Sequence, residues 1–161
     1  LPAVGVGQAC STLVGKYLGE KNINKSKQSI IEGVRGSFII MGTMGLIFIF
    51  FPSYIISFFT NDSEVIRMGV SILPWVGILQ FVDVFAITLW FALSGAGDTK
   101  FTAMVGIIAS WTIFIPLSYI LGIKYNFGLY GPWIAFAIFL VIEAAFIIFR
   151  VIQGKWKHIE V

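Results

Sequence analysis

The chain alternates between long apolar blocks and short polar connectors. A membrane-spanning α-helix needs about 20 mainly apolar residues, and four blocks reach that length, at about 36–59, 68–93, 101–122 and 131–152. A fifth apolar segment, about 1–15, is too short to span and is interpreted as the end of a helix. The pattern predicts an all-α integral membrane protein: a polytopic bundle of transmembrane helices, in a single transmembrane domain over 1–161 that we expect to be a fragment.

The connectors carry turn and capping residues. Residues 15–35 contain the one polar segment of any length, and residues 60–63 form a tight link whose side chains can cap the next helix. In residues 95–100 we expect Gly95 or Gly97 to end one helix with a positive φ and Asp98 or Thr99 to cap the next. This stretch lacks the GxxxxGK[ST] spacing of a phosphate-binding loop.

Two prolines, Pro74 and Pro116, lie inside apolar blocks. Each removes one backbone hydrogen bond from a helix. Membrane helices tolerate this where neighbouring groups satisfy the freed carbonyl. We therefore expect kinks at both positions, either static or acting as hinges.

The composition excludes a soluble domain. The 161 residues are 58% hydrophobic and 12% charged, whereas soluble domains average roughly 25% charged residues. The net charge of +3 is no sign of nucleic-acid binding, because the basic residues lie between apolar blocks rather than among stacking aromatics. The expected partner is the lipid bilayer, with no nucleic acid.

The basic residues are distributed unequally between the two sides of the predicted membrane. Nine of the 11 fall in 15–35, at Lys100 and in the C-terminal stretch from Arg150 onwards, and only Arg67 and Lys124 fall on the other side. The positive-inside rule then places the C-terminus in the cytoplasm. We expect a multi-pass protein of the cell membrane, with Trp156 at the level of the lipid headgroups on the cytoplasmic side.

The sequence offers no constellation for catalysis. Cys10 is the single cysteine, so an intrachain disulfide is impossible, and His158 is the single histidine, which excludes a two-histidine metal motif. An integral membrane enzyme would need a nucleophile with a base, or a metal site. We therefore predict a protein that is not an enzyme and that has no cofactor.

Two acidic residues lie inside apolar blocks. Asp83 is near the middle of 68–93, and Glu143 is near the middle of 131–152. Intramembrane carboxylates cost about 2.5–3.5 kcal/mol on insertion scales and usually mark an ion or proton path. Gln80 lies three residues before Asp83, on the same helix face. The alternatives are a protonated Asp83 with one interhelical hydrogen bond, a Gln80 bonded to a neighbouring helix, and a long-range pairing of Glu143 with Arg150 on the same helix.

Several segments, in order, resemble the MATE (multidrug and toxic compound extrusion) transporters. Gly95-Ala96-Gly97-Asp98-Thr99-Lys100 is similar to the family's turn after helix ten, with Ser94 where an arginine is often found. The other matching segments are 1–9, 13–19, 128–135, and Arg150 with 154–157. The resemblance implies part of the C-terminal lobe of a twelve-helix transporter, namely half of helix eight and helices nine to twelve. The N-terminal helices of the full-length transporter would then be partners.

The resemblance also implies a function. The family exports drugs and organic cations in exchange for Na⁺ or H⁺, so small cationic or amphipathic substrates are expected. In one family branch, an acidic residue on helix ten, fifteen residues before the Asp of the turn, contributes to the cation site. Asp83 lies fifteen residues before Asp98 and matches that position. A Na⁺ ion at Asp83 would be the one metal ion bound. Glu143 and Gln80 are secondary candidates. The alternative is a flippase for lipid-linked oligosaccharides, which would need buried cationic residues to attract a pyrophosphate.

Overall fold

The computed structural model is a bundle of α-helices, and it describes residues 2–159 except the side chain of His158. Leu1, in the first predicted segment, and the His158 side chain lie outside the described part. Four helical segments are long and apolar enough to cross a membrane: Ile23–Phe50, Ser63–Gly95, Thr99–Lys124 and Tyr130–Gln153. The predicted class, an all-α transmembrane bundle, is confirmed. In chain order the elements are α1 (Pro2–Gly19), α2 (Ile23–Phe50), α3 (Pro52–Phe59), α4 (Ser63–Gly95), α5 (Thr99–Ala109), η1 (Ser110–Phe114), α6 (Ile115–Tyr119), η2 (Ile120–Lys124), α7 (Tyr130–Gln153) and η3 (Lys155–His158).

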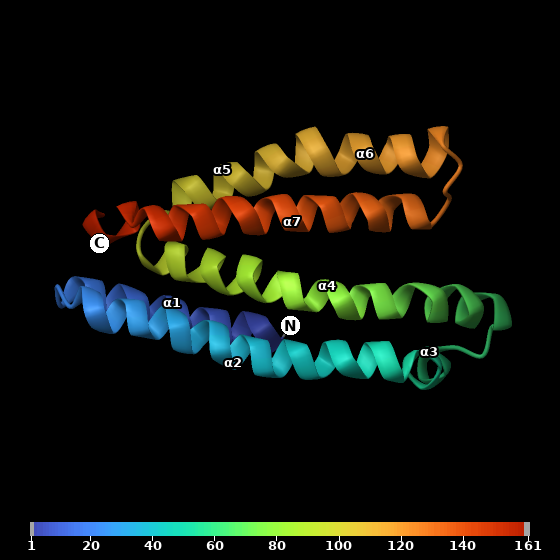
Figure 1. The fold of residues 1–161 in the computed structure, drawn as a ribbon, viewed down its shortest axis with the longest axis horizontal. Helices are drawn as coiled ribbons and strands as arrows, with labels where there is room; N and C mark the ends of the chain where they lie inside the picture. Colours follow the sequence, from blue (N-terminus) through green and yellow to red (C-terminus); the bar gives the residue numbers. More distant parts are fainter. Residues whose placement is uncertain (1, 160–161) are drawn as a thin grey trace.

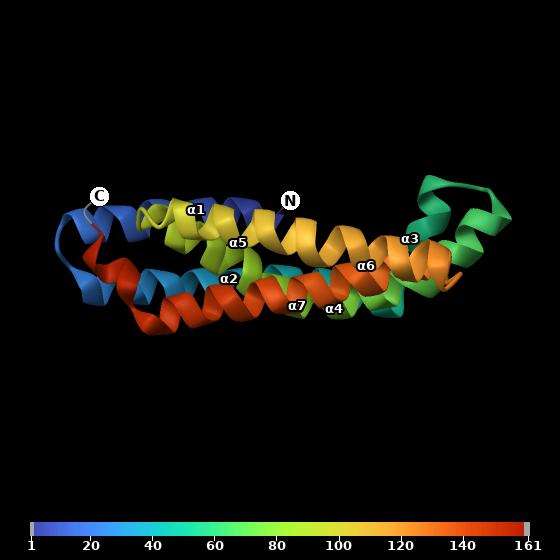
Figure 2. The same ribbon diagram turned by 90° about the horizontal axis from the view of Figure 1, so that it is seen from above.

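Three long helices form one layer of the bundle. Helices α2, α4 and α7 lie side by side, with α4 in the centre (Figure 1). Seen from above, α1 and α5 lie on the same side of this layer, α1 over α2 and α4 and the α5–α6 segment over α7 (Figure 2). The α1–α2 turn and the C-terminus mark one end of the bundle, called here the C-terminal end (Figure 1). The opposite end, which carries α3, is called the α3 end.

The predicted polar connector over 15–35 is wrong. Helix α1 continues to Gly19 and α2 already begins at Ile23, so only a short turn separates them. The Lys, Glu and Gln residues of this segment are good helix formers. The side chain of Asn22 accepts a hydrogen bond from the backbone N–H of Lys25 and caps α2. Polarity therefore marked the membrane boundary here, not the end of a helix.

The first predicted span, 36–59, is not one helix. The chain breaks at Phe51, and the short helix α3 follows from Pro52. A proline disfavours the α conformation in the residue before it, and Phe51 has φ −125° and ψ 39°. The spanning part therefore ends at Phe50, and α3 turns across the end of the bundle (Figure 2).

The two prolines behave differently. Helix α4 is continuous through Pro74. Around Pro116 the hydrogen bonding changes, because the π-helical turns η1 and η2 flank α6. The Ile115 N–H donates to the Ser110 carbonyl, five residues earlier. Such turns are frequently found at functional sites, and η1 supplies Phe114 to the cavity described below.

The core is concentrated at the C-terminal end of the bundle, where α1, α2, α4 and α7 meet. Trp156 belongs to this core, with only 1% of its surface exposed. Its indole Nε1 donates a hydrogen bond to the Val151 carbonyl over 3.0 Å. The prediction that Trp156 lies among lipid headgroups is therefore wrong, because η3 folds the ring back under α7.

Close contact between α2 and α4 depends on two glycines. A Cβ at Gly45 would lie 2.6 Å from the Gly77 carbonyl oxygen, and a Cβ at Gly77 would lie 2.6 Å from that of Gly45. Without side chains, the two backbones approach directly, as is typical of membrane helices. This contact fixes α4 against α2 and leaves the opposite side of α4 free to face α7.

Candidate functional site

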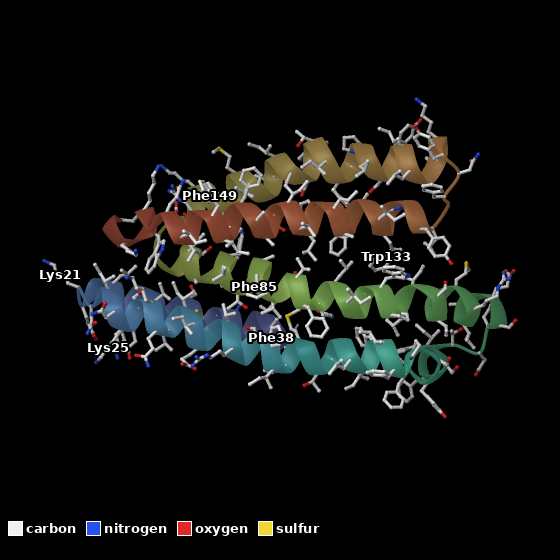
Figure 3. The ribbon with its side chains drawn as sticks, viewed as in Figure 1. Lys21, Lys25, Phe38, Phe85, Trp133 and Phe149 are labelled. Atoms are coloured by element: carbon white, nitrogen blue, oxygen red, sulfur yellow. The ribbon has the colours of Figure 1, made fainter. Side chains whose placement is uncertain are left out.

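A cavity of about 470 Å³ lies between α4, η1 and α7. Most of its wall is apolar or aromatic. The two polar side chains that line it come from α4. Trp133, another lining residue, lies between α7 and α4 (Figure 3). The lining residues are Val76, Leu79, Gln80, Asp83, Phe114, Pro132, Trp133, Phe136 and Leu140.

Asp83 reaches this cavity from within the membrane-spanning part of α4. At about 1.5 Å of rise per residue, it lies roughly 18 Å from the end of α4 at Gly95 and roughly 30 Å from its start. Because α4 is longer than a hydrocarbon core of about 30 Å, a carboxyl group this far from both helix ends lies inside the core. Asp83 is half-buried, and no other described side chain hydrogen-bonds to it or forms an ion pair with it. The interhelical hydrogen bond considered as an alternative is therefore absent from the described residues.

Gln80 lies one turn before Asp83 and lines the same cavity. The helical spacing i, i+3 puts the two side chains on one face of α4. The Gln80 side chain makes no hydrogen bond to another described helix, so its amide and the Asp83 carboxyl are both available to a ligand. An amide oxygen and a carboxylate are suitable ligands for a hard cation, although two residues do not complete a coordination shell. The described residues contain no cluster of three or more His, Cys, Asp or Glu side chains for a metal ion.

Glu143 does not line this cavity. Its carboxylate faces α5, where Oε1 lies 3.6 Å from the position that a Cβ on Gly106 would occupy. A side chain at position 106 would therefore be in van der Waals contact with Glu143. The two intramembrane acids thus make different contacts, Asp83 in the cavity and Glu143 between α5 and α7, but they are near enough for their charges to interact.

Arg150 pairs with Asp98, not with Glu143. The Arg150 Nε donates to Asp98 Oδ2 over 2.6 Å, and a terminal nitrogen donates to Oδ1 over 3.2 Å. The side chains are 18% and 7% exposed. The guanidinium also stacks on the Phe101 ring, 4.6 Å from its centroid. This bidentate pair joins the α4–α5 turn to the end of α7, and the sequence reasoning missed it.

The turn itself follows the prediction in part. Gly97 has φ +84°, a conformation that glycine adopts without strain. Asp98 stands at the N-cap of α5, but its side chain makes no capping hydrogen bond. The predicted capping by the Asp98 side chain is wrong because Arg150 takes both carboxylate oxygens, and Thr99, the other predicted cap, is already the first residue of α5. At the start of α4, in contrast, Asp62 does cap, accepting from the N–H groups of Glu64 and Val65.

Comparison with known proteins identifies relatives for nearly the whole chain. A family model described as MatE matches residues 1–120. A probable multidrug resistance protein NorM from Thermotoga maritima is 29% identical over 157 residues, which cover 98% of this chain and 34% of that protein. A protein of the same description from Listeria innocua is 30% identical over 147 residues, covering 91% of this chain and 32% of its own length.

A solved structure has the same fold. The crystal structure of the eukaryotic MATE transporter AtDTX14 matches with a TM-score of 0.89 at 21% identity, covering 96% of this chain and 35% of the other. The chain therefore spans about a third of the length of the proteins it resembles.

Proposed function

Because the chain belongs to the MATE family, a family of membrane transporters rather than enzymes, we propose that the protein exports small cationic or amphipathic compounds in exchange for Na⁺ or H⁺. The observation that carries this proposal is the unpaired Asp83 carboxyl in an aromatic cavity within the membrane. A carboxyl group at this depth is stable either when protonated or with a cation beside it. It therefore offers one binding position to a proton, a Na⁺ ion or an organic cation.

The cavity walls suit an organic cation as well as an inorganic one. Phe114, Trp133 and Phe136 line the same cavity as the Asp83 carboxyl group, and ring faces attract ammonium groups within about 6 Å. Among the described residues, no lysine or arginine lines the cavity. A cavity without cationic groups favours a positively charged cargo over the pyrophosphate of a lipid-linked oligosaccharide.

Exchange follows if the coupling ion and the drug compete for Asp83. Binding of the ion neutralises the carboxyl group, and the drug loses its counter-charge. For this to drive a cycle, the ion must bind the inward and outward states with different affinities. Pro74 lies about two and a half turns before Asp83 in α4, and we propose that α4 bends there between the two states.

Transport is tested with the full-length protein in proteoliposomes loaded with a fluorescent organic cation. An imposed Na⁺ or H⁺ gradient is expected to accelerate dye movement relative to protein-free vesicles, and the effective gradient identifies the coupling ion. If neither the Na⁺ gradient nor the H⁺ gradient changes the rate of dye movement, the proposal of ion exchange is wrong.

The proposed orientation places the C-terminal end of the bundle in the cytoplasm, since most basic residues lie there. Single cysteines at Asn22 and Asn126 would lie at opposite ends of the bundle (Figure 1). In a full-length protein whose other cysteines have been replaced, an impermeant maleimide is expected to label Asn126→Cys in intact cells. Asn22→Cys should react only after permeabilisation. The reversed pattern would invert the orientation, and equal labelling would contradict the number of spans.

A further inference from the structure

We propose that a second hollow, on the other side of the α4–α7 contact, binds an acyl chain of an anionic phospholipid in the leaflet at the α3 end. This hollow, the α4–α7 groove, has a volume of about 910 Å³. Its lining is almost entirely apolar and aromatic. The residues are Ile72, Trp75, Ile78, Leu79, Asn126, Phe127, Tyr130, Trp133, Ile134, Ala137 and Ile138.

The groove is separate from the Asp83 cavity. Leu79 and Trp133 line both hollows and form the wall between them. Phe114 of η1 lines only the cavity, and no residue of the α5–η2 segment lines the groove. The groove therefore opens on the face of α4 and α7 away from α5, where Trp75 is 66% exposed.

The dimensions fit one lipid leaflet. Along α7 the groove extends from Tyr130 to Ile138, which is about 12 Å at 1.5 Å per residue. One leaflet contributes about half of a hydrocarbon core that is about 30 Å thick. The groove thus runs from the membrane surface at the α3 end to near the middle of the bilayer.

The outer rim of the groove is polar. The Tyr130 hydroxyl and the Ser71 hydroxyl are 2.9 Å apart and join α7 to α4 above the apolar part. Asn126 adds an amide at the same end. These groups lie where a lipid carries its glycerol and ester oxygens, so an acyl chain entering the groove would leave its polar part against them.

Arg67 places a positive charge above the groove. Arg67 lies four residues before Ser71 and eight before Trp75, so all three share one face of α4. Arg67 is exposed, and the ion pairs among described side chains are Lys16–Glu20, Glu32–Arg35 and Asp98–Arg150, none of which includes it. Glu64, three residues before Arg67, is the nearest carboxylate in the sequence. A phosphate at headgroup level would complement Arg67, whereas an apolar helix lying in the groove would leave it without a partner.

The proposal is tested by tryptophan quenching in the full-length protein. In one variant Trp75 is the only tryptophan. In a control variant the only tryptophan is Trp111, which is 68% exposed on the α5–η1 surface. Each protein is reconstituted with phosphatidylglycerol or phosphatidylcholine carrying brominated acyl chains. One surface arginine contributes about fivefold to anionic lipid binding, so quenching of Trp75 should show about that preference for phosphatidylglycerol. Quenching of Trp111 should show no preference between the two lipids. Because the two lipids are compared at the same tryptophan, the different depths of Trp75 and Trp111 in the membrane do not affect the result.

A charge variant identifies the source of the preference. Arg67→Gln should bring the Trp75 preference close to one, while Arg35→Gln, near the middle of α2, which does not line the groove, should leave it unchanged. Equal quenching of Trp75 by both lipids would overturn the anionic-lipid site and leave only bulk lipid. Absence of quenching at Trp75 by either lipid would show that another part of the protein fills the groove. Both outcomes can occur whether or not the protein exports cations.

Discussion

Replacing Asp83 with Asn in the full-length protein is expected to abolish ion-driven export, so that dye leaves proteoliposomes no faster than it leaves protein-free vesicles. Asn fills nearly the same space but cannot bind a proton or carry a negative charge at neutral pH. The drug and the coupling ion then lose the group for which they compete. Insertion into the membrane should be unchanged or improved, because the cost of burying a carboxylate disappears.

A matched control separates this effect from general damage. Asp62→Asn replaces an exposed acid on the same helix, and Asn is also a good N-cap, so export should stay at the wild-type rate. If Asp83→Asn exports at that rate under both Na⁺ and H⁺ gradients, Asp83 has a structural role. Glu143, at the α5–α7 contact, would then be the next residue to test.

The sequence predicted the spanning helices but not all of their boundaries. Apolar blocks reveal the part of a helix that lipid covers, so the pattern could not reveal how far α1 and α2 continue into water. The break at Phe51 did leave a signal, because Pro52 restricts the residue before it. Reading 36–59 as one apolar block concealed that signal.

The candidate site was predictable only where one helix supplies it. The spacing of Gln80 and Asp83 on α4 is local, and both line the same cavity. Phe114 and Trp133 come from other segments, and their positions depend on how α4, η1 and α7 cross. The Asp98–Arg150 pair joins residues 52 apart in the chain. A capping preference is a local rule, and here a tertiary contact overrides it.

Removing Arg150 is expected to cause the largest loss of stability among the charged residues at the C-terminal end of the bundle. Arg150→Gln leaves the Asp98 carboxylate, which is only 7% exposed, without a partner. Breaking a buried pair on one side costs about 3–5 kcal/mol, and the partial exposure of Arg150 favours the lower figure. Asp98→Asn should cost less, because the long Arg150 side chain can turn its charge towards water. The measurement is thermal unfolding of the full-length protein in detergent.

Two comparisons make this prediction specific. Arg35→Gln breaks the pair with Glu32, in which the Arg35 side chain is 68% exposed and the Glu32 side chain 56%. This change should cost at most about 1 kcal/mol. Arg150→Lys keeps the charge but loses the bidentate geometry and the stacking on Phe101, so its stability should lie between those of the wild type and Arg150→Gln. The double variant Asp98→Asn, Arg150→Gln should be more stable than Arg150→Gln alone, since no unpaired charge remains. If the two single effects simply add, or if Arg150→Gln costs no more than Arg35→Gln, the pair does not hold the α4–α5 turn against α7.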